Sequence, residues 1–380
     1  MKIVVVDTSM KGREHVFFNS AMLKMLRMNS PSDIVVYADK EHCNLLENEL
    51  KMQQYTFKPI KVFSHRLWRC VFSDVFSSIQ ILRILFKTSS KDCVILLNRL
   101  PLTLLTYNLL NLIFKRKTLS VLHGELESII NFKNVKGLTK YYYSIFLLSY
   151  YCSNRFMNYM VLGEPILKQL SGINFGRANL FSIDHPYDYT NTIKPNCDLE
   201  KINIGIIGSA LQRKNSQLIF QLADLYSKKS KNCKKDITFT IVGSVDNYIA
   251  NFVNDFVEYN KTKVMYDNEV YAAKISALHY SLQFYDNQTN LALASGSFFD
   301  CLKYEKPILA IKGNPFVDYY FEKFGNIGFQ FNTVYEMAMF LLHYDFDEID
   351  YKEQVYNLKA AKNVLKLENI ALVFKKEFKL

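Results

Sequence analysis

The stretch INIGIIGSALQRKNSQLIFQLADLY, residues 202–226, predicts a buried β-strand, a short polar loop and a helix. The strand ends at Gly208, and the loop carries Ser209, Arg213 and Lys214. Glycine lets the backbone approach a ligand closely, a helix N-terminus attracts an anion, and basic side chains neutralise phosphate. The stretch therefore predicts a phosphate-binding turn in an α/β domain. The alternative is that the same strand, glycine and helix serve only to pack the domain.

A second stretch, ASGSFFDCLKYEKPILA at residues 294–310, predicts a helix followed by a strand. Ser295, Gly296 and Ser297 fall at the start of the helix, Asp300 lies one turn further on, and Pro307 opens the strand. Backbone N–H groups and hydroxyls at a helix start can bind a phosphate, and a carboxylate one turn later can accept hydrogen bonds from ribose hydroxyls. The alternative is a serine N-cap with a favourable first-turn acid.

Similar alternation of strands and helices extends to both sides of these two stretches. The strands are apolar almost throughout, which indicates parallel sheets covered on both faces by helices. Because 380 residues exceed one ordinary core, we expect two Rossmann-like domains. They span residues 1–190 and 191–360, with a C-terminal helix in 361–380 that packs on the first domain and a linker within 179–203.

The predicted strands are 3–6, 33–38, 60–63, 93–97, 118–122, 157–163, 202–208, 237–243, 263–266, 281–285 and 307–311. The predicted helices are 16–28, 40–52, 72–86, 102–114, one from Pro165, 215–228, 249–259, 271–278, 298–304 and later ones to the C-terminus.

The charge of the chain is divided unevenly. Residues 1–195 carry 25 basic and 14 acidic side chains, whereas the remainder carries 22 of each. The whole net charge of +11 therefore lies in the first half, which indicates that this half approaches an anion such as a phosphate or an acidic membrane. A solvated basic surface is the plain alternative.

Two apolar segments lie in this basic half, LTLLTYNLLNLIF at 102–114 and YYYSIFLLSYYCSNRFMNYMVL at 141–162. Neither supplies the roughly 20 apolar residues that a membrane span needs. Their aromatic rings and neighbouring lysines suit a membrane interface, and burial as ordinary helices is the alternative. The seven scattered cysteines and the absence of a recognisable signal peptide favour the cytoplasm, with peripheral contact at the inner face of the membrane.

The order of INIGIIGS, RKN, FTIVGS, NEVYAAKISALHYSLQFY and ASGSFFDCLKYEKPILA resembles the donor domain of GT-B glycosyltransferases of the family 4-like group, which includes bacterial enzymes of surface polysaccharide synthesis. The resemblance implies an α/β GT-B fold, with two tandem doubly wound domains that face a central cleft, and a nucleotide-sugar donor. In that group an acidic residue seven positions before a proline, here Asp300 before Pro307, helps to bind the donor. The donor-site residues implied are Gly208, Ser209, Arg213, Lys214, Gly243, Glu269, Ser295, Gly296, Ser297 and Asp300.

The sequence departs from that group at two positions. The group has a second acidic residue eight positions before the ribose-binding one and a glutamate in the latter place, whereas this chain has Ala292 and Asp300. Since the earlier acid often contacts the transferred sugar, the donor sugar and the stereochemical outcome stay open.

The first half supplies the acceptor side and the general base in enzymes of this kind. Ligands of open α/β sheets bind at the carboxyl ends of the strands. Two loops meet that condition, VDTSMKGREHVFF at 6–18 and SVLHGELESI at 120–129. His123 and Glu125 are the first candidates for the catalytic base, although a loop histidine is often structural. The competing catalytic candidates are Glu14 and His15, and the candidates for binding the acceptor are Gly12 and Arg13.

Other motifs are absent from the sequence. It contains no GxGxxG after the first strand, no P-loop and no cluster of metal-ligand residues. We therefore expect a metal-independent glycosyltransferase without a cofactor, which transfers a sugar to a glycan or lipid-linked oligosaccharide and binds no nucleic acid. The alternatives are a nucleotide-sugar epimerase of the same fold and a non-catalytic protein that binds an anionic surface.

Overall fold

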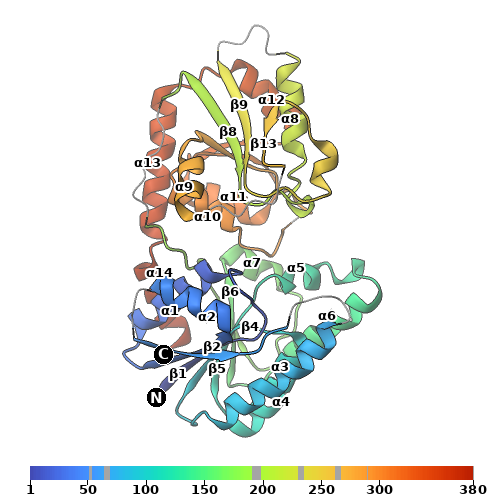
Figure 1. Ribbon diagram of the computed structural model, residues 1–380, viewed down its shortest axis with the longest axis vertical. Helices are drawn as coiled ribbons and strands as arrows, with labels where there is room; N and C mark the ends of the chain where they lie inside the picture. The colour runs from blue at the N-terminus through green and yellow to red at the C-terminus, as the bar shows by residue number, and fades with distance from the viewer. Residues whose placement is uncertain are drawn as a thin grey trace. The chain divides into compact units, whose positions relative to one another are not determined.

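The computed structural model describes residues 1–50, 54–63, 69–190, 198–229, 235–261, 267–288 and 290–379. It divides the chain into two compact units. The first unit comprises Met1–Asp188 and Leu365–Leu380, and the second comprises Tyr189–Val364. Each unit contains one wholly parallel sheet with helices on its faces, as Figure 1 shows.

The sheet of the first unit has seven strands in the order β3-β2-β1-β4-β5-β6-β7. Ile3, Val4, Val5 and Val6 of its central strand are all buried, because helices cover both faces. The strands are β1 Lys2–Asp7, β2 Asp33–Asp39, β3 Tyr55–Ile60, β4 Cys93–Asn98, β5 Lys117–Val121, β6 Met157–Leu162 and β7 Asn179–Ile183.

Two helical layers enclose this sheet. Helices α1, α2 and α14 form one layer, and α3, α4 and α6 form the other (Figure 1). The C-terminal helix α14 packs against α1 and β7, so the end of the chain completes the first unit. The helices are α1 Val16–Asn29, α2 Lys40–Leu50, α3 Arg69–Phe86, α4 Pro101–Phe114, α5 Glu125–Ile130, α6 Gly137–Tyr151, α7 Glu164–Gln169 and α14 Leu367–Phe378.

The sheet of the second unit has six strands in the order β10-β9-β8-β11-β12-β13. Its core is formed by apolar side chains of β8, β9 and β11 packed against helices α8 and α12. The strands are β8 Lys201–Ile207, β9 Asp236–Val242, β10 Val257–Glu258, β11 Tyr280–Gln283, β12 Ile308–Ile311 and β13 Gly328–Phe331. The helices are α8 Leu218–Ser227, α9 Asn268–Ser276, α10 Gly296–Lys303, α11 Pro315–Phe324, α12 Val334–His343 and α13 Glu348–Val364.

Both sheets reverse their strand order at the first strand of the unit. In the first unit β1 lies between β2 and β4, and in the second β8 lies between β9 and β11. Ligands of open α/β sheets bind outside the carboxyl ends of the strands at this point. The fold therefore directs attention to the loops after Asp7 and after Ile207.

The structure corrects three of the predicted segments and adds one strand. The predicted helix at 249–259 is wrong, because only the 3₁₀ turn Ile249–Phe252 forms before the edge strand β10. The side chain of Asn254 prevents the helix from continuing. Its Oδ1 accepts a hydrogen bond from the backbone N–H of Phe256, and its amide donates to the carbonyl oxygen of Phe220. Part of the predicted linker is strand β7, the strand expected at 60–63 lies at Tyr55–Ile60, and β13 was not predicted. The strand expected at 263–266 lies outside the described residues.

A buried carboxylate joins helices α3 and α4. Both oxygens of Asp74 accept a backbone N–H at the start of α4, from Leu102 and Thr103, each at 2.7 Å. The Thr103 hydroxyl donates to the same carboxylate at 2.6 Å. The helix's own N-cap residue, Leu100, has no side chain able to cap it. Asp74 therefore caps α4 from a neighbouring helix and aligns the two helices.

We expect Asp74→Ala to lower the free energy of unfolding by about 1–3 kcal/mol, because it leaves two amides and a hydroxyl without their acceptor in a buried site. Asp74→Asn keeps one acceptor oxygen and should lose less. Urea denaturation followed by circular dichroism measures both. Equal stability of Asp74→Ala and the unmodified chain would contradict the capping role.

Candidate functional site

The carboxyl ends of β8 and β9 touch each other through two glycines. Gly208 has a φ of 83°, and a Cβ atom added to Gly243 would lie 2.2 Å from the carbonyl oxygen of Gly208. The backbone N–H of Ala210 continues the contact by donating to the carbonyl oxygen of Ser244 at 2.8 Å. Beside it, the hydroxyls of Ser209 and Ser244 lie 2.9 Å apart. These contacts fix the turn after β8 against the turn after β9.

Arg213 and Lys214 follow in a 3₁₀ turn, Gln212–Lys214, that precedes α8. Arg213 forms a reciprocal contact with Asn290: its Nη1 donates to the amide oxygen at 3.0 Å, and the amide nitrogen donates to the backbone carbonyl of Arg213 at 2.6 Å. Asn215 ends the turn with a φ of 53° and donates its amide to Asp286 at 2.9 Å. The basic loop is therefore held to the segment that follows β11.

Three hydroxyls cluster at the start of α10. Ser295 caps the helix, since its Oγ accepts from the backbone N–H of Phe298. The Oγ of Ser297 lies 2.9 Å from that of Ser295, and the Tyr285 hydroxyl lies 2.8 Å from Ser295 and 3.3 Å from Ser297. Gly296, between the serines, is exposed, and a Cβ atom there would meet nothing within 4 Å. The open backbone at Gly296 leaves room for a ligand at this helix start.

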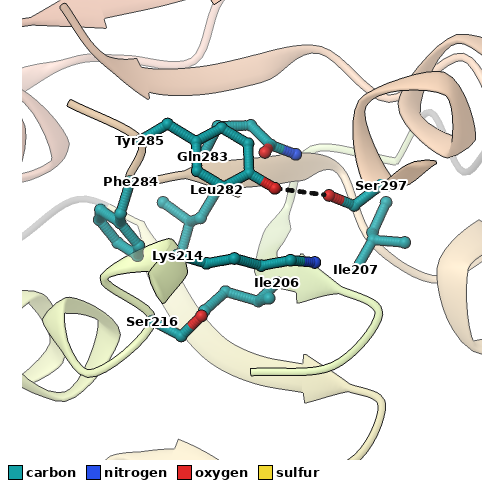
Figure 2. Close-up of a pocket in the computed structure, with 9 residues that line it drawn as sticks. All are labelled: Ile206, Ile207, Lys214, Ser216, Leu282, Gln283, Phe284, Tyr285 and Ser297. Carbon is teal, nitrogen blue, oxygen red and sulfur yellow. Dashed lines mark hydrogen bonds between the residues drawn. The ribbon is translucent and has the colours of Figure 1, made fainter. Parts of the chain in front are cut away.

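A small pocket joins the basic loop to this hydroxyl cluster. In Figure 2 the side chain of Lys214 crosses the pocket and extends its amino group toward Ile207 and Ser297. The lining residues are Ile206, Ile207, Lys214, Ser216, Leu282, Gln283, Phe284, Tyr285 and Ser297. One cation therefore faces hydroxyl donors at a strand end.

Asp300 lies one turn into α10 and accepts a hydrogen bond from the Tyr271 hydroxyl at 3.2 Å. Burial, together with the Asp300 charge, raises the pKa of Tyr271 well above its usual value, so the phenol stays protonated and donates. A Cβ atom at Gly208 would lie 3.8 Å from that hydroxyl and 4.0 Å from the Cβ of Ser297. Asp300 thus belongs to the same neighbourhood as the turn after β8.

The second unit brings most of the predicted donor residues to one edge of its sheet. Gly208, Ser209 and Gly243 form the touching turns, and Lys214 shares a pocket with Ser297. Glu269 is exposed in the first turn of α9, and it is Tyr271, two residues further along that helix, that contacts Asp300.

Sequence reasoning missed three residues of this region, Tyr271, Tyr285 and Asn290. Tyr285 alone gave a usable signal, because it lies two residues after the end of β11, where ligand-facing side chains are expected. Ala292, where the resembling group has an acid, is buried.

In the first unit Asp7 organises the loop after β1. Its Oδ1 accepts the backbone N–H groups of Ser9 and Met10, and its Oδ2 accepts the side-chain amides of Asn19 and Asn98 at 2.9 Å each. Asp7 is only 1% exposed. This carboxylate therefore holds the loop that carries Gly12, Arg13, Glu14 and His15.

The four predicted residues of this loop differ in their exposure to solvent. Gly12 is buried with a φ of 52°, and its carbonyl oxygen lies 2.8 Å from Nδ1 of His42. Arg13, Glu14 and His15 are exposed, and the Glu14 carboxylate accepts the backbone N–H of Lys11. The loop therefore presents Arg13 and His15 to solvent, while Gly12 anchors it.

Glu125 is committed to a buried ion pair. Its Oε1 lies 2.6 Å from Nη2 of Arg99, whose side chain is 1% exposed, and it also accepts the Tyr150 hydroxyl at 3.3 Å. Its Oε2 accepts the backbone N–H of His123 at 3.1 Å. Arg99 follows directly on β4, so its position after a buried strand is a signal that sequence reasoning overlooked. Both carboxylate oxygens are thus occupied in holding Arg99 and the His123 backbone.

His123 lies in an aromatic cluster, with its ring centroid 4.6 Å from that of Phe18 and 5.3 Å from that of His15. Its Nε2 is buried and has no hydrogen-bond partner among the described residues. Burial lowers the pKa of His123 well below its usual value, and the neighbouring His15 and Arg99 lower it further. The imidazole is therefore neutral at neutral pH and has a ring nitrogen without a protein partner.

Two features are absent from the described residues. No group of three or more His, Cys, Asp or Glu side chains among them is placed to hold a metal ion. Within the same ranges, no helix combines the length and the hydropathy needed to cross a membrane.

Comparison with known proteins identifies the fold. No protein-family model matches the sequence, and no curated protein does. Solved structures match over the whole chain. Anabaena HepE in complex with UDP has a TM-score of 0.69 at 13% identity, with 100% of both chains covered. TarM has a TM-score of 0.68 at 12% identity, covering 100% of this chain and 99% of its own. Sucrose-phosphate synthase from Thermosynechococcus elongatus has a TM-score of 0.68 at 10% identity, covering 100% and 98%. The fold is therefore GT-B, with two Rossmann-like domains in one chain.

We expect Glu125→Ala to lower the free energy of unfolding by about 3–5 kcal/mol, because it leaves the Arg99 guanidinium buried without a countercharge. The double variant Arg99→Met with Glu125→Leu removes both charges and should recover most of that loss. Urea denaturation of the single and double variants measures the coupling. If Glu125→Ala is as stable as the unmodified chain, the ion pair is not structural.

The histidines make the first unit sensitive to acid. Burial lowers the pKa of His185 from 6.5 to about 3. This histidine therefore binds a proton more readily in the unfolded chain than in the folded one. The stability that this neutral imidazole contributes is fully present above pH 6.5 and is lost as the pH falls toward 3.

The free energy of unfolding of the unmodified chain should fall when the pH is lowered from 7 to 5. In His185→Gln this fall should be smaller by about 2 kcal/mol. Chemical denaturation at both pH values measures it, and the exposed His343→Gln is the matched control. Equal losses in His185→Gln and the unmodified chain would show that His185 is not held neutral.

Proposed function

We propose that this chain transfers a sugar from a nucleotide diphosphate sugar to a hydroxyl of a glycan or lipid-linked oligosaccharide, as a step in surface polysaccharide synthesis. One observation carries the proposal: Lys214 and Ser297 line one pocket, and Ser297 and Tyr271, the partner of Asp300, lie beside the turn at Gly208, where the strand order of the sheet reverses. Structures of HepE, which has the same fold, hold UDP and UDP-glucose.

The donor diphosphate would bind between the basic loop and the start of α10. Lys214 supplies a charge, Ser297 a hydroxyl, and the exposed Gly296 leaves backbone N–H groups accessible. Asp300, held by Tyr271, would accept hydrogen bonds from the ribose hydroxyls. Arg213, fixed by Asn290, would add a second positive charge. Phosphate and ribose would thus be bound by adjacent side chains of one unit.

The same groups would stabilise the leaving group. As the bond from the anomeric carbon to the phosphate oxygen breaks, its electron pair stays on the diphosphate, and negative charge develops there. Lysine, arginine and a helix N-terminus placed at that charge favour the transition state. The proposal therefore includes transfer without a metal ion and without a further cofactor.

The acceptor would bind to the first unit. Its hydroxyl oxygen forms a bond to the anomeric carbon, and its proton passes to a base. His123 is the base that we favour, because its imidazole is neutral and its Nε2 has no partner among the described residues. Glu125 acts instead through its hydrogen bond to the His123 backbone. Arg13 is the exposed side chain of the neighbouring loop that would contact an anionic acceptor, and Glu14 and His15 of that loop are the competing candidates for the base.

Peripheral contact with an anionic membrane also belongs to this proposal. A lipid-linked oligosaccharide is held in a bilayer, and the first half of the chain carries the whole net positive charge. Contact with the bilayer would bring the enzyme to its acceptor.

Calorimetry with a panel of nucleoside diphosphates tests the donor site and identifies the base. We expect Lys214→Ala and Asp300→Ala each to weaken binding by about 10- to 100-fold, the loss typical of a hydrogen bond to a charged group. The matched control is Lys228→Ala, since Lys228 pairs with Asp224 on the exposed side of α8 in the same unit. Added EDTA should leave the affinity unchanged.

Two outcomes would contradict the proposal. Unchanged affinity in both Lys214→Ala and Asp300→Ala would place the nucleotide elsewhere. Conversion of the sugar nucleotide to an isomer in the absence of any acceptor would identify an epimerase rather than a transferase. Nuclear magnetic resonance of the reaction products distinguishes sugar transfer to an acceptor from isomerisation of the sugar nucleotide. It also shows whether the anomeric configuration is inverted or retained.

A further inference from the structure

Helices α3, α4 and α6 have an unusual distribution of polarity. Large apolar side chains on their outer side are exposed, and we call this surface the α3–α4–α6 face. Of the seven large apolar side chains in the described residues that are at least 70% exposed, five lie on it: Phe72, Phe86, Ile113, Leu138 and Tyr141. A surface helix of a globular domain normally turns such side chains toward the core.

Polar side chains occupy the buried side of the same helices. In α4, Thr103, Asn108 and Asn111 are fully buried, whereas Leu112 and Ile113 are exposed. In α3 the buried side holds Ser73, Asp74, Ser77, Ser78 and Gln80, and in α6 it holds Ser149. Buried apolar side chains, among them Ile81, Leu85, Leu104 and Phe146, share that side, so the three-helix layer is mixed inside and apolar outside.

Hydrogen bonds explain how this layer stays together. The Asn108 amide donates to the carbonyl oxygen of Ser149 at 2.6 Å and to the Ser153 hydroxyl at 3.0 Å. The Ser149 hydroxyl donates to the carbonyl oxygen of Pro101 at 3.1 Å. Together with the Asp74 cap on α4, these bonds join the three helices, while the Ser73 hydroxyl and the Asn108 amide oxygen have no hydrogen-bond partner among the described residues. The exposed apolar side chains of these helices, such as Ile113 and Leu138, lie outside this packing and are accessible to a partner.

The charge around this face has one sign. Between Ser128 and Gly163 the sequence has four basic residues, Lys133, Lys136, Lys140 and Arg155, and no acidic one. All four are exposed. Asp74, the acidic residue of α3, is buried, and its carboxylate caps the start of α4. The partner of this face is therefore anionic as well as apolar.

A bilayer with acidic lipids satisfies both conditions. Aliphatic and aromatic side chains insert at the headgroup level, and lysines pair with the lipid phosphates. A second copy of the chain fits less well, since a twofold contact would place the basic clusters against each other. Nucleic acid offers no apolar surface for Ile113 or Leu138. Because no described helix can span a membrane, contact would be on the surface alone.

We propose that the α3–α4–α6 face docks on an anionic bilayer, with Phe72, Ile113 and Leu138 inserted among the headgroups and Lys133, Lys136 and Lys140 on lipid phosphates. This extends the proposed function and rests on it only for the lipid-linked acceptor. It names the helices that would hold the enzyme at the membrane.

Vesicle flotation tests the docking surface with the full chain. The vesicles contain two parts phosphatidylcholine to one part phosphatidylglycerol, with pure phosphatidylcholine for comparison. Lys133→Ala, Lys136→Ala and Lys140→Ala together should weaken binding on the order of 100-fold. Leu112→Ser with Ile113→Ser should weaken it about 10-fold or more.

Matched control variants come from elsewhere in the chain. Ile349→Ser on α13 removes an apolar side chain that is 74% exposed, against 76% for Ile113. Lys375→Ala with Lys376→Ala removes two exposed lysines from α14, in the opposite helical layer. Both controls should bind vesicles like the unmodified chain. Nucleoside diphosphate affinity is measured for every variant, so that a folding defect or a failure of the donor site is seen separately.

Three outcomes would overturn the docking proposal. The first is equal binding of the unmodified chain to both vesicle types, or to neither. The second is binding to anionic vesicles that the α3–α4–α6 variants leave unchanged. The third is a dimer in solution that Leu112→Ser with Ile113→Ser dissociates, which would identify a second copy as the occupant.

Discussion

The contact between Gly208 and Gly243 is the constraint on which the candidate donor site depends. A side chain at position 243 would place its first carbon 2.2 Å from the Gly208 carbonyl oxygen, which no packing adjustment could accommodate. With two glycines the ends of β8 and β9 come together, and Ala210 pairs with the backbone beyond Gly243. The turn then leads the chain toward Lys214, which shares its pocket with Ser297. Without this contact, the basic loop would have no fixed position relative to α10.

In the first unit, buried polar groups determine what the other side chains can do. Asp7 holds the loop after β1, and Arg99 engages Glu125, which leaves His123 as the neutral group with an unpartnered ring nitrogen among the described residues. Asp74 and Asn108 join the helices of the outer layer by hydrogen bonds. The same helices expose other apolar side chains, such as Ile113 and Leu138, at the surface.

The sequence predicted the α/β fold because parallel strands covered on both faces are apolar along their whole length, as in β1, β4 and β8. It failed where one polar side chain redirected the backbone. The apolar spacing of residues 249–259 suits a helix, yet the side-chain hydrogen bonds of Asn254 turn the chain toward an edge strand. It also failed at β7, whose buried and partly exposed residues alternate and are soon followed by Pro186.

The sequence by itself determined the two parallel sheets and the residue types at their carboxyl ends, because strand periodicity, glycine and charge are local properties. From the sequence, Glu125 was a reasonable candidate for the base. The sequence does not reveal that Arg99, which follows a different strand, forms an ion pair with that carboxylate. The tertiary structure alone brings together side chains that are distant in the sequence: Tyr271 contacts Asp300, Arg213 contacts Asn290, and Lys214 lines a pocket with Ser297. The hydrogen bonds that join α3, α4 and α6 are likewise a tertiary result, because they depend on distances between helices that the order of residues does not contain.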